Sequence, residues 1–84
     1  MEETICFDST VINDELILKT LNEVKTILVE RGYNASNQIV GYLISGDPGY
    51  ITSYKNARNL MLSLERSKTI ETLLRNALKW DIWD

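Results

Sequence analysis

A stripe of apolar residues at helical spacing is the feature that most constrains this fold. Apolar side chains recur every three or four residues at Ile17, Leu21, Val24 and Leu28. This spacing is the period of one face of an α-helix. Asn13 or Asp14 can cap the start of the helix, and Gly32 can form a left-handed cap after its last turn. The sequence therefore predicts a first helix over residues 14–31.

A second, shorter helix is predicted over residues 36–44. Asn34 or Ser36 can supply its N-cap, and Gly46 ends it. Because this segment is apolar nearly all round, we expect it to form the buried centre of the fold. A β-strand is the alternative, since most of its residues are β-branched or aromatic.

Glycine and proline divide the centre of the chain. Gly41 inside the second helix costs roughly 1 kcal/mol relative to alanine, so we expect close approach of another backbone to compensate. Asp47 followed by Pro48 fits an N-cap and the first position of a new turn. The segment thus separates the second helix from the elements that follow.

Two further helices are predicted in the second half. A third runs from Thr52 or Ser53 to Arg66, and a fourth follows Ser67 as its cap. The residues expected to face inward are Ala57, Leu60, Met61 and Leu64 in the third helix, and Ile70, Leu73, Leu74, Ala77 and Leu78 in the fourth. Trp80 and Trp83 lie three residues apart and either close the core or form an interface.

The predicted fold is therefore a small all-α bundle of about four helices. Residues 13–84 form one helical domain and residues 1–12 a flexible N-terminal arm. A chain of 84 residues buries only about 60–65% of the surface of its unfolded form, which leaves a lone core marginally stable. We therefore expect the chain to be a homodimer.

Composition excludes several functions. The net charge of −3 argues against binding to nucleic acid, which depends on excess basic residues. No stretch approaches the roughly 18 apolar residues of a membrane span, so no membrane insertion is expected. The chain has no histidine and one cysteine, Cys6, so we expect no catalytic residues, no metal site and no cofactor. The lone cysteine also favours a reducing, cytoplasmic location.

A more specific signal lies in the central motif. Its residues are Gly32, Asn37, Gln38, Gly41, Gly46, Asp47 and Pro48, followed by Tyr50-Ile51 and Ala57-Arg58. Over about residues 31–66 this motif resembles the IreB family of small regulatory phosphoproteins of Gram-positive bacteria. The N-terminal element around Thr4 and Phe7 is also similar to that family.

The resemblance implies a function that composition and spacing do not show. Members of the family are cytosolic helical homodimers without catalytic activity. They are substrates of a membrane-bound Ser/Thr kinase with PASTA domains, and Thr4 matches the phosphorylated threonine. They restrain peptidoglycan synthesis by promoting degradation of a MurA-type enolpyruvyl transferase by the Clp protease. Phosphorylation relieves this restraint, and cephalosporin tolerance depends on it.

These implications give a hypothesis for the mechanism. Arg58, Arg66 and Lys68 are the predicted partner-binding residues. A phosphate on Thr4 adds about −1.5 to −2 charge, so the arm either folds back on these basic residues or repels an acidic partner. Ser9 and Thr10 are competing phosphate acceptors. The alternative function is a constitutive helical adaptor without kinase input.

Overall fold

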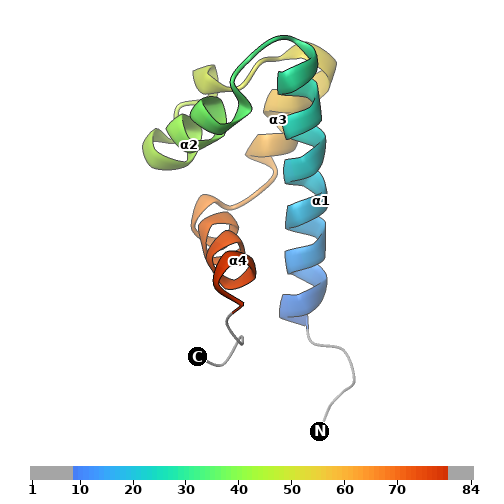
Figure 1. The fold of residues 1–84 in the computed structure, drawn as a ribbon, viewed down its shortest axis with the longest axis vertical. Helices are drawn as coiled ribbons and strands as arrows, with labels where there is room; N and C mark the ends of the chain where they lie inside the picture. Colours follow the sequence, from blue (N-terminus) through green and yellow to red (C-terminus); the bar gives the residue numbers. More distant parts are fainter. Residues whose placement is uncertain (1–8, 80–84) are drawn as a thin grey trace, which may run out of the picture.

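The computed structural model describes the backbone of residues 9–79 and the side chains of residues 13–79. Within this range the chain forms helices and turns and no strand (Figure 1). The elements are α1 (Ser9–Glu30), α2 (Ala35–Ser45), the 3₁₀ turns η1 (Pro48–Tyr50) and η2 (Tyr54–Asn56), α3 (Ala57–Leu62) and α4 (Arg66–Leu78). The predicted all-α class is confirmed. No helix in this part of the chain has the length and apolar character needed to cross a membrane.

Helix α1 is the spine of the fold, and α2, α3 and α4 all contact it (Figure 1). Its 22 residues give it a length of about 33 Å. Helices α2 and α3 lie near its C-terminal end, whereas α4 runs antiparallel to it beside its N-terminal half (Figure 1). The start of α1 and the end of α4 therefore lie at the same end of the molecule.

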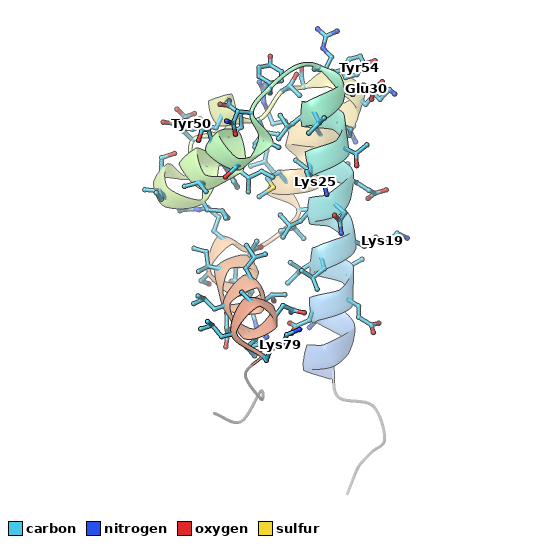
Figure 2. All side chains as sticks on the ribbon, in the orientation of Figure 1. Lys19, Lys25, Glu30, Tyr50, Tyr54 and Lys79 are labelled. Atoms are coloured by element: carbon cyan, nitrogen blue, oxygen red, sulfur yellow. The ribbon has the colours of Figure 1, made fainter. Side chains whose placement is uncertain are left out.

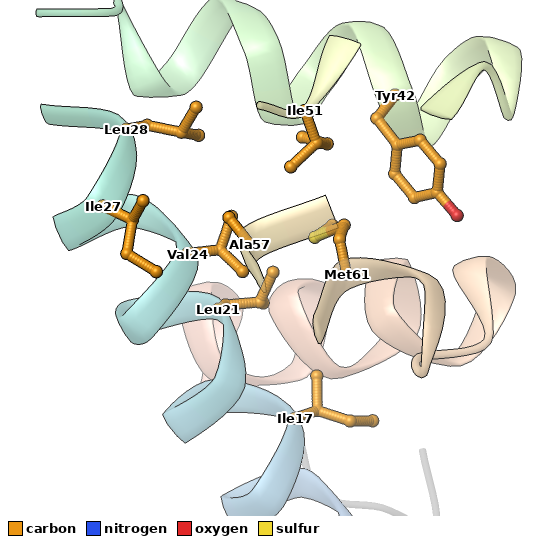
Figure 3. Close-up of a cluster of buried hydrophobic side chains, with 9 residues drawn as sticks. All are labelled: Ile17, Leu21, Val24, Ile27, Leu28, Tyr42, Ile51, Ala57 and Met61. Atoms are coloured by element: carbon orange, nitrogen blue, oxygen red, sulfur yellow. The ribbon is translucent and has the colours of Figure 1, made fainter. Parts of the chain in front are cut away.

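The hydrophobic core lies where α1 meets α2, α3 and the turn before α3 (Figure 3). Its members are Ile17, Leu21, Val24, Ile27, Leu28, Tyr42, Ile51, Ala57 and Met61. Four of these residues form the apolar stripe predicted for α1, and Ile27 of the same helix is a fifth. The predicted inward face of the first helix is therefore confirmed.

The two ends of α1 differ in how well their predicted boundaries agree with the structure. Gly32 has φ 83°, and the amides of Gly32 and Tyr33 donate to the carbonyls of Val29 and Leu28 at 3.0 and 2.9 Å. This is the Schellman pattern, so the predicted C-cap is confirmed. The start differs, because α1 begins at Ser9 and includes residues 9–12, which were assigned to the arm. Asp14 does not cap the helix but pairs with a residue of α4.

Helix α2 forms as predicted, and the strand alternative is wrong. The Oδ1 atom of Asn34 accepts the amide of Asn37 at 3.1 Å, and Gly46 forms the left-handed cap at φ 75°. The expectation that α2 is the buried centre is also wrong. Only Tyr42 is buried, while Val40 and Ile44 are 49% and 79% exposed. Helix α2 lies at the side of α1, so one face contacts the core and the other faces solvent.

Gly41 is required by a side chain and not, as predicted, by a backbone. A Cβ atom at Gly41 would lie 2.3 Å from Cε1 and 2.5 Å from Cδ1 of Tyr50. The main chain of Tyr50 is held in place, since its carbonyl accepts Gln38 Nε2 at 2.8 Å and its amide donates to the Asp47 carbonyl at 3.2 Å. The tyrosine ring therefore packs against the bare backbone of α2 at Gly41.

Helix α3 is shorter than the predicted helix over 52–66. Lys55 and Asn56 have φ values of 49° and 66°, a left-handed conformation that interrupts a helix. The ammonium of Lys55 lies 3.0 Å from the Glu30 carboxylate, and Arg31 lies 4.5 Å from the centre of the Tyr54 ring. These contacts attach the turn to the end of α1 (Figure 2). The α3 helix then begins at Ala57, which is buried together with Met61 as predicted.

Helix α4 forms as predicted but begins at Arg66, before the predicted cap Ser67, and its inward face was predicted wrongly. Glu65 and not Ser67 is the residue at the N-cap. Thr69 and Thr72 are buried against the rest of the fold, whereas the predicted core residues are mostly exposed. The exposed fractions are 40% for Ile70, 36% for Leu73, 46% for Leu74 and 62% for Leu78. Helix α4 therefore packs through its polar face and leaves its apolar face open.

Candidate functional site

The predicted phosphate acceptor Thr4 and the aromatic pair Trp80 and Trp83 lie outside the described residues. The competing acceptors, Ser9 and Thr10, form the first residues of α1. The carbonyls of the first helical turn accept amides from the next turn, so these residues must unfold locally before they can extend through a kinase active site. The structure thus makes Ser9 and Thr10 poorer kinase substrates than a residue in extended chain.

Arg58 is held in a structural contact. Its Nε atom donates to the carbonyl of Ile51 at 2.9 Å, and its side chain is partly buried. Ile51 is fully buried and belongs to the core. Arg58 therefore supports the turn before α3, a role that the sequence did not indicate. Replacing it would disturb the fold as well as any partner contact.

Arg66 also supports the backbone. Its NH1 atom donates to the carbonyl of Leu43 in the last turn of α2 at 3.1 Å. The guanidinium lies against Gly46, where an added Cβ atom would be 2.8 Å from Cζ. A cation at the C-terminus of a helix satisfies an unpaired carbonyl and interacts favourably with the helix dipole. Arg66 thus connects the end of α2 to the start of α4.

Lys68 is the residue of the three most available to a partner. It is exposed in the first turn of α4, where the helix dipole disfavours a cation. The N-cap residue Glu65 forms no side-chain cap, so the first amides of α4 have no such partner. Lys68, Arg66 and these amides outweigh the one exposed carboxylate of this turn, Glu65, so the start of α4 is a small electropositive surface. The structure places Arg66 in the same turn, whereas Arg58 lies in α3.

The distance along α1 limits what the arm can reach. Arg75 pairs with Asp14, so this level of α4 lies about 7.5 Å above Ser9, and Lys68 lies about 10.5 Å further along the antiparallel α4. The five residues from Thr4 to Ser9 span at most about 18 Å when fully extended. The helix axes are a further 8–10 Å apart, as is usual for packed helices. The separation of about 20 Å between these backbones is close to the length of the extended segment, and the long Lys68 side chain shortens the gap, so a phosphate on Thr4 would reach Lys68 only with the arm almost fully extended.

The remaining motif residues have structural roles. Asp47 Oδ1 accepts the amide of Gly49 at 2.8 Å, which caps η1. Pro48 takes the first position of that turn, as predicted. Asn37 donates its amide to the α2 cap, and Gln38 binds the Tyr50 carbonyl. The central motif therefore specifies how α2 and η1 pack together.

A polar cluster joins α4 to α1 and was not found from the sequence. The NH2 atom of Arg75 lies 2.8 Å from Asp14 Oδ1, and its NH1 atom 2.8 Å from Glu71 Oε2. Thr72 Oγ1 donates to Asp14 Oδ1 at 2.9 Å. The hydrogen bond to Asp14 raises the pKa of the Arg75 guanidinium. We call Asp14, Glu71, Thr72 and Arg75 the α1–α4 polar cluster.

The described residues contain no group of three or more Cys, Asp or Glu side chains placed to hold a metal ion.

Comparison with protein-family models gives evidence that is independent of these contacts. The family model described as IreB regulatory phosphoprotein matches residues 2–79. The match covers nearly the whole chain and includes Thr4 and every residue of the central motif.

Proposed function

The chain belongs to the IreB family of regulatory phosphoproteins, and on that premise we propose that it regulates peptidoglycan synthesis without catalysing a reaction. In this proposal a PASTA-type Ser/Thr kinase phosphorylates Thr4. The unmodified protein promotes turnover of a MurA-type enzyme by the Clp protease in the cytoplasm, and phosphorylation ends this effect. The observation that carries the proposal is the family match over residues 2–79, which includes Thr4.

The phosphate switch has two versions, fold-back of the arm onto the basic residues and repulsion of an acidic partner, and the contacts of the basic residues favour repulsion. A phosphate on Thr4 would reach Lys68 only with the arm almost fully extended, and Arg66 lies two residues closer to the start of α4, further from the arm. Arg58 and Arg66 are each engaged with a backbone carbonyl. A fold-back of the arm onto these residues is therefore disfavoured, and we propose that the added charge repels an acidic partner. In this version the acidic partner binds the electropositive surface around Lys68, and the phosphate repels the partner without contacting Lys68 itself.

We also propose that the protein is a homodimer through the open face of α4. Ile70, Leu74 and Leu78 lie on this face and are all at least 40% exposed. Exposed apolar residues in a continuous stripe indicate an interaction surface. Leu74→Glu should shift the sedimentation profile to the monomer. Leu62→Glu on α3 is a matched control, because Leu62 and Leu74 have the same exposed fraction of 46%.

Phosphorylation with a purified PASTA-type kinase tests the proposal. We expect mass spectrometry to find one phosphate on the chain, absent from Thr4→Ala and retained in Thr10→Ala. A pull-down with the MurA-type enzyme and Clp subunits should recover more of both with the unmodified protein. Equal recovery in both states would refute the switch and favour the constitutive adaptor.

A separate variant tests the partner surface. Lys68→Glu should weaken recovery of the partners, whereas Lys19→Glu on the exposed surface of α1 should not. The two substitutions change net charge equally, so a difference between them reports on position. If Lys68→Glu binds as well as Lys19→Glu, the start of α4 is not a partner surface.

A further inference from the structure

An apolar groove of about 350 Å³ opens between α1, α2 and α4. Its walls are aliphatic and include Leu18 and Leu21 of α1, Ile39, Val40 and Leu43 of α2, and Leu73 of α4. Val40 is 49% exposed and Leu73 is 36% exposed. The groove is thus an unfilled continuation of the core, at the lower end of the volume range of ligand-binding sites.

One cation stands beside the aliphatic walls. Lys25 lines the groove from α1 and is exposed, and Figure 2 shows it on the part of α1 nearest α2. A second hollow of the described surface, between α1 and α3, is lined mainly by charged and polar side chains such as Glu23, Thr26 and Lys55. Of these two hollows, therefore, the groove between α1, α2 and α4 is the one that combines apolar walls with a neighbouring cation.

The chain itself contains a segment of matching chemistry. Residues 80–84 read Trp-Asp-Ile-Trp-Asp, so three of them carry large apolar side chains and two carry carboxylates. This composition complements aliphatic walls beside a lysine. The segment lies beyond residue 79, where the family match ends, so the family model does not account for it.

The geometry of α4 brings this segment within reach of the groove. Lys79 has φ 58° and forms a left-handed cap, with its amide bound to the Arg75 carbonyl. This conformation ends the helix and turns the chain away from its axis. Leu73 lies about 9 Å back along α4 from Lys79, whereas five extended residues span about 16 Å. The segment is therefore long enough to return along α4 and enter the groove at its Leu73 end.

We infer that residues 80–84 bind in the groove of their own chain, with the tryptophans against its aliphatic walls and the positive charge of Lys25 favouring the two carboxylates of the segment. A tethered segment has an effective concentration in the millimolar range, which favours it over a free ligand. The groove lies on the Leu73 side of α4, so the inference does not require the proposed dimer or the phosphate switch.

Tryptophan fluorescence tests this inference directly, because Trp80 and Trp83 are the only tryptophans of the chain. We expect acrylamide to quench the full-length protein severalfold less than a peptide of residues 79–84, with emission at shorter wavelength. Val40→Asp should remove this protection, because it places a carboxylate in an apolar wall that faces an acidic segment. Val29→Asp on α1 is the matched control, since Val29 is exposed and does not line the groove.

A charge reversal provides a second test that leaves the core intact. Lys25→Glu should increase quenching, whereas Lys19→Glu should leave it unchanged, and far-UV circular dichroism should show the same helix content in both. Three results would overturn the inference. They are quenching equal to that of the free peptide, equal quenching in groove and control variants, and protection that is lost on dilution together with a dimer.

Discussion

Replacing Gly41 with alanine adds a methyl group where the ring of Tyr50 already lies. In most helices this substitution stabilises by roughly 1 kcal/mol, the difference in helix propensity between glycine and alanine. Here the new Cβ atom would lie 2.3 Å from Tyr50 Cε1, which no real contact tolerates. The ring has to move, because the Tyr50 main chain is bound by Gln38 and Asp47.

The two effects oppose each other, and their sizes decide the sign. Overpacking a well-packed site costs about 1–3 kcal/mol, so after the gain in propensity we expect Gly41→Ala to lower the free energy of unfolding by up to about 2 kcal/mol. In a Tyr50→Ala background there is no ring to displace. The same substitution should then stabilise the protein by roughly 1 kcal/mol.

The parent protein, the two single variants and the double variant form a double-mutant cycle. Urea denaturation followed by circular dichroism measures the free energy of unfolding of all four. The expected coupling energy between positions 41 and 50 is about 1–3 kcal/mol, and the sign of the Gly41→Ala effect should reverse between the two backgrounds. If Gly41→Ala stabilises the parent protein as much as the Tyr50→Ala variant, the ring does not require the glycine. The account of the central motif given above would then be wrong.

Three further predictions follow from single contacts. Leu28 is fully buried, so Leu28→Ala should lower the free energy of unfolding by about 2–5 kcal/mol in urea denaturation. Asn34→Ala removes the α2 cap and should cost about 1 kcal/mol, whereas Asn34→Asp should retain most of the stability. The hydrogen bond to Glu30 raises the pKa of Lys55 above 10.5, so Glu30→Gln should lower that pKa in an NMR titration. Because the folded-state pKa is raised, the attraction is complete below pH 10.5 and is lost as pH rises through the folded value.

Local chemistry allowed the ends of α1 and α2 to be predicted. Gly32, Asn34 and Gly46 act on backbone groups within five residues of themselves, so their roles can be read from the adjacent sequence. The face of α4 could not be predicted in this way. It depends on contacts of Thr72 and Arg75 with Asp14, which is 58 and 61 residues away in the chain.

The same distinction between local and long-range contacts applies to the candidate site. The sequence identified Arg58, Arg66 and Lys68 as a basic group, but it could not show that two of them bind the carbonyls of Ile51 and Leu43. Charge and resemblance therefore located the region, while the three-dimensional contacts decided which side chain is free to bind a partner.

The polar attachment of α4 determines how the molecule opens. When α4 separates from α1, Asp14, Thr72 and Arg75 exchange protein partners for water, and less apolar surface is exposed than in complete unfolding, because most core residues lie between α1, α2 and α3. The denaturant dependence of an unfolding step scales with the surface it exposes. Amide exchange in α4 should therefore proceed through a local opening that urea accelerates less than it accelerates complete unfolding, whereas exchange of the core amides of α1 requires the whole protein to unfold.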